Sequence, residues 1–195
     1  MAIEIAVYGQ APLAWRPWRG ETASGLEHGF ARIDVVDPSD SAAALLQRRS
    51  GLHDLATEDS MGDAQAAKLD PYAEHTFIVA KIAELGSDRI TYTDVGMFLT
   101  RNRLITICRS RSPFNHRLRD RASRIAAHPR KGADFAVHGV LDLVVDHYFP
   151  VIQGIADQVL AMERRLTSDP LDHADIERIF RFRRDTVHFQ HVVSR

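Results

Sequence analysis

The stretch LDLVVDHYFPVIQGIADQVLAMERRL, residues 141–166, decides the fold of this chain. Its apolar residues recur at steps of three and four, the spacing of a helix that packs lengthwise against another helix. They are Leu141, Val144, Tyr148, Val151, Ile155, Val159, Met162 and Leu166. At about 1.5 Å per residue, the stretch spans roughly 39 Å as a helix. It therefore predicts a long helical arm.

Pro150 lies near the middle of this predicted helix. A proline has no N–H, and its ring crowds the carbonyl four residues earlier, here that of Asp146, so we expect a kink. The residues 169–172 (DPLD) should break the chain, and a last helix should run from about Asp172 to the final residue. The two helices are expected to form an antiparallel hairpin.

The residues before the long helix predict a mixture of strands and helices. Runs rich in β-branched and aromatic residues predict strands at 1–8, 30–37, 75–84, 88–102 and 103–109. Arg101-Asn102 predicts a tight turn between the last two, which are expected to form an antiparallel hairpin. Helices are expected at 40–50, between capping residues Ser39 or Asp40 and Gly51, and at 112–127, while the acidic segment 52–72 suggests a broken helix.

This order of elements indicates an α/β or α+β fold. We expect a mixed sheet of about five to seven strands flanked by helices, followed by the long kinked helical hairpin. The prediction is a single domain over residues 1–195, with a mixed portion at 1–131 and a helical arm at 132–195.

The composition is that of a soluble globular protein, with 45% hydrophobic and 26% charged residues. A net charge of −1 excludes a molecule polarised as a whole toward nucleic acid or an anionic membrane. The sequence shows neither a signal peptide nor an apolar run long enough to span a membrane. Cys108 is the single cysteine and lies in an apolar run, which favours a buried free thiol. No catalytic motif is apparent, so we do not expect an enzyme.

Four segments resemble, in the same order, the CorA family of divalent-cation channels. The resemblance covers about residues 30–195, with Ala31 and Arg32 near the place where that family usually has a tryptophan. The segments are LHDLATEDSMGDAQAAKLDPYAEHTFIVAKI (52–82), VGMFLTRNRLITICR (95–109), HGVLDLVVDHYFPVIQGIADQVLAMERRL (138–166) and RIFRFRRDTVHFQHVVSR (178–195).

The resemblance implies a cytoplasmic regulatory domain of a channel that carries Mg²⁺, and also Co²⁺, across the membrane. The family's Gly-Met-Asn signature and its two membrane helices are not in the sequence and are expected beyond residue 195, where the last helical pattern still continues. The full-length protein is then expected to be a homopentamer with this domain on the cytoplasmic side of the inner membrane. The chain alone should be soluble and monomeric or weakly associated.

The same resemblance implies the metal-binding residues. Glu58 and Asp59 correspond to a carboxylate pair that faces a neighbouring subunit and senses Mg²⁺, and Asp142 corresponds to a residue of a second inter-subunit cation site. Asp146, one turn further along, would support that site from its outer coordination shell. Because Mg²⁺ takes oxygen ligands and retains its waters, such half-sites should bind it weakly.

Zinc transport by a related branch of the superfamily is one alternative. His188 and His191 are spaced i, i+3 on the last helix, close enough to share a Zn²⁺ ion, but two ligands alone make a weak site. The residues His138, Asp142, Asp146 and His147 form a second weak cluster.

A soluble scaffold or nucleic-acid-binding protein is the alternative from another class. The segment 101–131 holds ten Lys or Arg residues and one acidic residue, Asp120. Such a basic stripe can bind nucleic acid. Apart from Phe114 it lacks interleaved aromatic residues, so a solvated helix face, with no nucleic-acid partner, is favoured.

Overall fold

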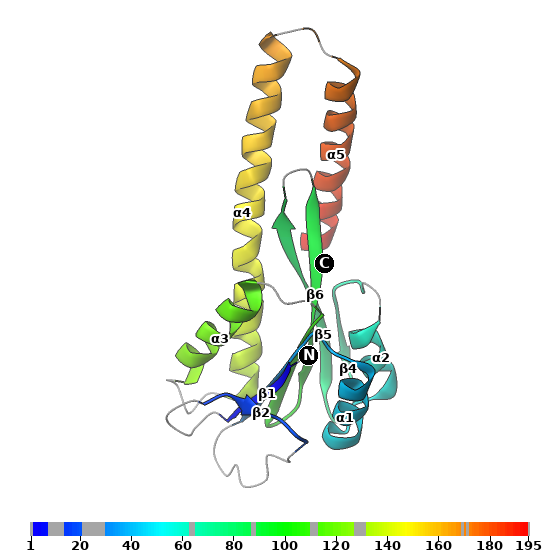
Figure 1. Cartoon of the computed structure of the whole chain (residues 1–195), viewed down its shortest axis with the longest axis vertical. Helices are drawn as coiled ribbons and strands as arrows, with labels where there is room; N and C mark the ends of the chain where they lie inside the picture. Colours follow the sequence, from blue (N-terminus) through cyan, green and yellow to red (C-terminus); the bar gives the residue numbers. More distant parts are fainter. Residues whose placement is uncertain are drawn as a thin grey trace. The chain divides into compact units, whose positions relative to one another are not determined.

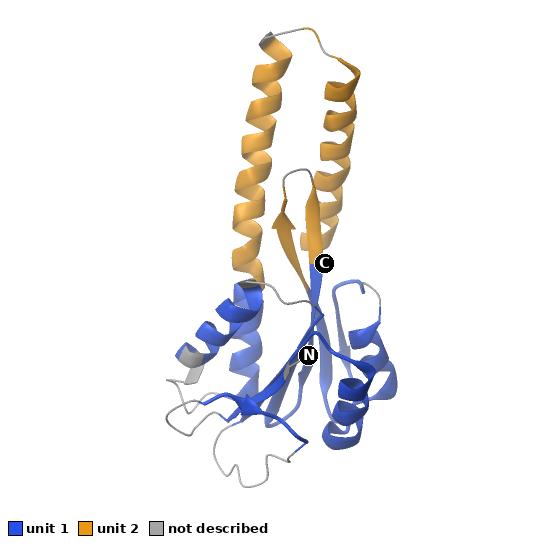
Figure 2. Cartoon of the chain, viewed as in Figure 1, with its two compact units in different colours: residues 1–80, 93–143 blue, residues 81–92, 144–195 orange. Residues whose placement is uncertain are grey.

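The computed structural model describes residues 2–7, 14–20, 30–62, 65–86, 89–109, 113–126, 132–168, 170 and 172–194. Figure 1 shows the elements of the chain. They divide into two compact units, of which unit 1 comprises residues 1–80 and 93–143 and unit 2 comprises residues 81–92 and 144–195 (Figure 2). The single domain expected from the sequence stays a prediction.

The strands form a seven-stranded sheet in the order β2-β1-β3-β7-β6-β5-β4, of which all but the distal ends of β5 and β6 belong to unit 1. The strands are β1 (Ala2–Val7), β2 (Arg16–Pro17), β3 (Ala31–Val36), β4 (Lys68–Pro71), β5 (Thr76–Leu85), β6 (Ile90–Leu99) and β7 (Arg103–Cys108). Strand β3 pairs parallel with β7, whereas β1 with β3 and β6 with β7 pair antiparallel. The predicted mixed sheet is therefore confirmed.

The expected hairpin between the last two strands is present. The amide of Thr100 at the end of β6 donates to the carbonyl of Arg103 at 2.9 Å, which closes a turn over residues 101–102. The carbonyl of Asn102 in that turn accepts from the amide of Ala31 at 2.9 Å, so the turn also fixes the start of β3.

Helices α1 (Asp40–Ser50) and α2 (Asp54–Met61) lie on one side of the sheet (Figure 1). The hydroxyl of Ser39 caps α1 by accepting from the amide of Ala42, and Gly51 ends it with φ of 64°, a conformation that glycine adopts without steric cost. The broken helix predicted for 52–72 is corrected: among the described residues of this segment, Asp54–Met61 is helical and Lys68–Pro71 is strand β4.

The main core lies between the sheet and these two helices. Alternate residues of the central strands, among them Ile33, Ile107 and Phe98, pack there with Leu46 of α1. The other face of the sheet carries the intervening residues of each strand. Within unit 1, helix α3 (Pro113–Ala126) and the first part of α4 (Ala133–Ser168) lie on this second side (Figure 1).

Unit 2 contains the rest of α4, helix α5 (His173–Val193) and the distal ends of β5 and β6. The two helices lie side by side and run in opposite directions (Figure 1), and an ion pair of 3.0 Å joins Arg165 to Asp175. Asp172 caps α5 in a capping box with Asp175. Pro150 lies inside α4, which continues through it without a break.

One described helix, Ala133–Thr167, is long and apolar enough to cross a membrane by length and composition. Length and composition alone are weak evidence for a membrane span, because a core helix of a soluble protein meets the same criteria. Part of α4 has that character, since Val140, Val144 and Val151 are buried. Of the breaks expected from the sequence, residues 127–131, 169 and 171 lie outside the described residues.

Candidate functional site

Helix α2 positions the first two predicted carboxylates. At its start the imidazole Nδ1 of His53 accepts from the amide of Leu55 at 3.3 Å, and at its end the amide of Gly62 donates to the carbonyl of Glu58 at 2.7 Å. The helix buries its Ala56–Thr57 side against the sheet. This orientation leaves the side chain of Glu58 exposed and that of Asp59 half-buried.

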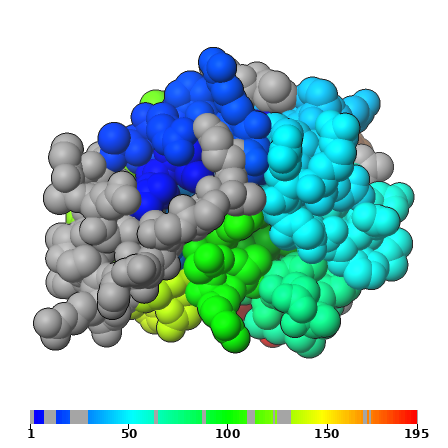
Figure 3. Space-filling model, turned by 90° about the horizontal axis from the view of Figure 1, so that it is seen from below, coloured from blue at the N-terminus to red at the C-terminus, as the bar shows by residue number. Residues whose placement is uncertain are grey.

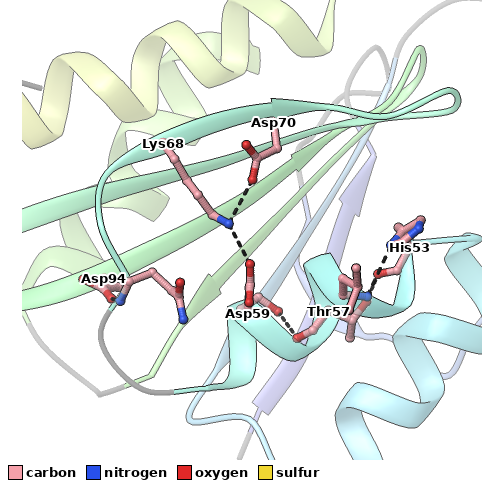
Figure 4. Close-up of polar contacts among 9 residues, drawn as sticks. His53, Thr57, Asp59, Lys68, Asp70 and Asp94 are labelled. Atoms are coloured by element: carbon pink, nitrogen blue, oxygen red, sulfur yellow. Dashed lines mark hydrogen bonds and ion pairs between the residues drawn. The ribbon is translucent and has the colours of Figure 1, made fainter.

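A lysine holds Asp59 in place (Figure 4). The ammonium of Lys68 on β4 donates to Asp59 Oδ2 at 2.6 Å, and it lies 2.9 Å from Asp70 Oδ2. It also lies 5.5 Å from the centroid of the Phe77 ring, a distance at which a cation is attracted to the ring face. The hydrogen bonds that Lys68 donates to Asp59 and then to Asp70 raise the pKa of Lys68 above its usual value.

The segment that leads from α2 into β4 is anchored separately. The backbone amide of Gln65 donates to Asp94 Oδ2 on β6 at 2.8 Å. This long-range bond attaches the segment just before β4 to β6. Lys68 is thereby held where it can contact both carboxylates.

Asp142 lies on the part of α4 that belongs to unit 1, and it too has a cationic partner. The guanidinium of Arg121 on α3 donates to Asp142 Oδ2 at 2.7 Å. The imidazole Nδ1 of His138, one turn earlier on α4, lies 3.6 Å from the same oxygen. The Asp142 side chain remains 45% exposed, so solvent ions can reach it.

The structure does not bring the four predicted residues together into one site. Glu58 and Asp59 share α2, Asp142 is on α4, and the exposed Asp146 falls in unit 2. Over the described ranges there is no group of three or more His, Cys, Asp or Glu side chains arranged to hold a metal ion. Any cation site at Asp59 or Asp142 would thus need ligands from another source, and the predicted roles stay predictions.

One of the two histidines on α5 considered for zinc has a structural contact. His188 packs edge-on against Tyr92, with ring centroids 5.0 Å apart. Burial, followed by the charge of Asp185, raises the pKa of Tyr92 to about 12. His188 therefore helps to pack the β5–β6 tip onto α5, and His191 lies on the same helix.

Several arginines of the basic segment are used within the chain. Arg109 donates to the carbonyl of Gly62, Arg119 pairs with Glu4, and Arg121 pairs with Asp142. The Arg119 guanidinium also lies 5.3 Å from the ring centroid of Trp15. These contacts attach α3 and the end of β7 to the rest of unit 1, which favours a structural role for these side chains over a nucleic-acid surface.

Cys108 is buried, as the sequence predicted. Burial, with a smaller contribution from Asp34, raises the pKa of its thiol to about 12, while Arg32 acts in the opposite direction. A thiol with this pKa is protonated at neutral pH and is a poor nucleophile or metal ligand. Cys108 therefore belongs to the core and not to a reactive site.

Sequence reasoning missed the cationic partners of the predicted carboxylates. The alternation of Lys68 and Asp70 could have placed both on one face of a strand, but residues 68–71 do not carry a strand-like composition. The sequence did not identify Arg121 as the partner of Asp142, because Arg121 is one of ten basic residues in its segment.

Two curated relatives are transporters by name. The chain is 28% identical over 131 residues to the "Putative metal ion transporter YfjQ" of Bacillus subtilis, covering 67% of this chain and 40% of that protein. It is 23% identical over 149 residues to the "Cobalt/magnesium transport protein CorA" of Thermotoga maritima, covering 73% of this chain and 41% of that protein. The chain thus spans about two fifths of the length of these relatives.

Solved structures share the fold. The soluble domain of CorA from Methanocaldococcus jannaschii superposes with a TM-score of 0.78 at 20% identity, over 98% of this chain and 74% of that one. The ZntB cytoplasmic domain from Vibrio parahaemolyticus superposes with a TM-score of 0.64 at 9% identity, over 100% of this chain and 79% of that one. At these identities the likeness concerns the fold alone.

The sequence also matches a family as a whole. Residues 27–195 match the family described as "CorA-like Mg2+ transporter protein", which is a family of transporters and not of enzymes. The match includes the sheet from β3 onward, the carboxylates of α2 and both long helices. The chain belongs to the CorA-like Mg²⁺ transporter protein family.

Proposed function

We propose that this chain is the cytoplasmic, Mg²⁺-sensing domain of a channel that carries Mg²⁺, and also Co²⁺, across the cell membrane. The observation that carries the proposal is the family match over residues 27–195, which includes Asp59 and Asp142. Both carboxylates are accessible, with side chains 34% and 45% exposed. Each is bound by a side-chain cation, so each lies where positive charge is already stabilised.

The chemistry of these residues suits an ion sensor. Mg²⁺ prefers carboxylate oxygens and keeps several of its waters, so a site with one or two carboxylates per subunit binds it weakly. A weak site is useful for sensing an abundant ion, because its occupancy changes within the ion's normal range. Glu58 and Asp59 would supply part of one inter-subunit site and Asp142 part of a second, with Asp146 supporting the second site from its outer coordination shell.

The proposed response to ion loss is electrostatic. When the bridging cation leaves, carboxylates of neighbouring subunits face each other without it. Two like charges about 4 Å apart repel by roughly 4 kcal/mol at an effective dielectric constant of 20. Repulsion of this size at several subunit contacts would loosen a closed assembly and favour opening.

The proposal includes an assembly and a location. The complete protein would be a homopentamer in the inner membrane, with this domain on the cytoplasmic side. Because the chain spans about two fifths of the relatives' length, the pore would be built by residues outside it. No nucleic-acid partner is proposed, since arginines of the basic segment pair within the chain.

Transport itself can be tested with the full-length protein in liposomes. A Mg²⁺-sensitive dye inside the vesicles should report Mg²⁺ entry, and Co²⁺ should compete with it. Parallel vesicles with a Zn²⁺ dye would test the zinc alternative, with which the ZntB-like fold is compatible. Uptake of Zn²⁺ without uptake of Mg²⁺ would replace the proposal by that alternative, and uptake of neither ion would contradict both.

A further inference from the structure

We infer that Lys68 is a tethered competitor for the divalent cation at Asp59, so that the ion must displace an ammonium of the same chain before it binds. This inference rests on the proposed function and concerns how the Asp59 site is regulated. It assigns to Lys68 the task of lowering the site's affinity for divalent ions.

The geometry places the ammonium between two carboxylates. Lys68 and Asp70 are alternate residues of β4, so their side chains project from the same face of the strand. Helix α2 brings Asp59 to this face, and Lys68 Nζ then lies 2.6 Å from Asp59 Oδ2 and 2.9 Å from Asp70 Oδ2 (Figure 4). The ring of Phe77, opposite Asp70 on β5, lies near the same ammonium.

The ammonium and a metal ion require the same oxygen. Asp59 Oδ2 accepts a short, charge-assisted hydrogen bond from Lys68. A divalent ion coordinated there would lie close to a positive charge, and the two cations would repel each other. The Lys68 side chain is 28% exposed and its stem is flexible, so it can move into solvent when the ion arrives.

The surroundings of the pair support an exchange at the surface. Seen from below in Figure 3, side chains of α1 and α2 (cyan) lie on the surface of unit 1 beside the blue-green atoms of the segment that follows β4. Asp59 and Asp70 are 34% and 41% exposed. An ion can therefore reach both carboxylates without opening the core.

Removing the ammonium should reveal the cation site. In Lys68→Met the apolar stem remains over Phe77, while Asp59 and Asp70 lose their counter-charge. Mn²⁺ is a suitable probe, because it accepts the same oxygen ligands as Mg²⁺ and its free hexaaqua form gives an EPR signal that disappears on binding. We would titrate Mn²⁺ into the 195-residue chain and its variants.

The expected result is that Lys68→Met binds Mn²⁺ about tenfold more tightly than the unmodified chain, as removal of one nearby positive charge implies. The charge-retaining control Lys68→Arg should bind as weakly as the unmodified chain. Adding Asp59→Asn to Lys68→Met should abolish the gain. Unfolding temperatures of all variants, measured without metal, would confirm that each is folded.

Two outcomes would overturn the inference. One is equal Mn²⁺ binding, or equal absence of binding, by the unmodified chain and Lys68→Met. The other is tighter binding by Lys68→Met that survives Asp59→Asn. Neither result would decide the proposed function, which has a separate test. That test measures Mg²⁺ inhibition of the full-length channel in which Asp59 and Asp142 are neutralised and Lys68 is unchanged.

Discussion

The guanidinium of Arg121 on α3 lies 2.7 Å from Oδ2 of Asp142 on α4. The pair joins two helices of unit 1 and leaves the Arg121 and Asp142 side chains 31% and 45% exposed. An ion pair this accessible is screened by water and salt. Asp142 can therefore exchange its partner for a dissolved cation without a large cost to the fold.

Neutralising Asp142 should leave the fold stable. We expect Asp142→Asn and Arg121→Met each to lower the free energy of unfolding by less than about 1 kcal/mol, because exposed ion pairs contribute little. Urea unfolding of the two variants and the double variant would give their coupling energy. A coupling of several kcal/mol would mean that Asp142 is a structural residue and would weaken its assignment to a sensor.

Gly154 on α4 leaves room for the Leu85 side chain in unit 2. A Cβ at this position of α4 would overlap Cδ2 of Leu85, at the end of β5. Overpacking of this kind costs about 1–3 kcal/mol, against about 1 kcal/mol gained from the better helix propensity of alanine. We expect Gly154→Ala to be net destabilising by up to about 2 kcal/mol, measured by urea unfolding.

A matched control would identify the contact. In a Leu85→Ala background the overlapping methyl group is absent, so Gly154→Ala should become neutral or stabilising. If the cost of Gly154→Ala is the same in both backgrounds, then the overlap with Leu85 is not its cause.

His75 should make the stability of unit 1 depend on pH. Its ring is buried and stacks on Tyr72, which also stacks on His53. Burial, followed by the charge of His53, lowers the pKa of His75 below its usual value of 6.5. The unfolded chain then binds the proton more readily than the folded chain, so the free energy of unfolding should fall as the pH drops below 6.5.

The slope should be at most about 1.4 kcal/mol for each pH unit for this one group. Urea unfolding at several pH values between neutrality and mild acid would measure it. In His75→Phe the ring can still pack on Tyr72 but cannot be protonated, so the curve should flatten in that range. An unchanged slope in His75→Phe would assign the pH dependence to other groups.

The 195-residue chain alone should be monomeric or weakly associated. Glu58, Asp59 and Asp142 supply only part of each proposed inter-subunit site, so metal bridges alone cannot hold the subunits together. Exposed apolar side chains on α5, such as Phe180 and Val187, would permit weak association. Sedimentation velocity at micromolar concentration should show a monomer or a rapid equilibrium between monomer and small oligomers. A stable pentamer would contradict this expectation.

Elements with local signals could be predicted from the sequence. Residue type predicted Ser39 or Asp40 and Gly51 as the ends of α1, and the structure has Ser39 as the N-cap and Gly51 as the C-cap. The antiparallel pair of β6 and β7 followed from two strand-like runs around a short turn. The helical hairpin was predicted from two apolar stripes of helical period, because the apolar face of a helix is stabilised by packing against another element.

The short strands could not be predicted in the same way. Strand β2 has two residues and β4 has four, and both contain a proline, Pro17 and Pro71. Alternation is not visible over so few residues, and their strand conformation comes from pairing with β1 and β5. The parallel pairing of β3 with β7 likewise depends on the whole sheet.

The candidate carboxylates were found by resemblance, but their partners were not. Lys68 is nine residues from Asp59 and lies on a strand that the sequence did not reveal. Arg121 is 21 residues from Asp142 and on a different helix. Such ion pairs are set by the packing of elements, which no local pattern of charges specifies.

The sensor assignment is tested most directly by ion flux through the reconstituted full-length Asp59→Asn/Asp142→Asn variant across a range of internal Mg²⁺. The exposed α4 carboxylate Asp157, neutralised as Asp157→Asn, serves as the matched control. We predict that the double variant still conducts but is no longer inhibited by internal Mg²⁺, while the control behaves as the unmodified channel. An inhibition curve of the double variant that overlays that of the unmodified channel would contradict the account.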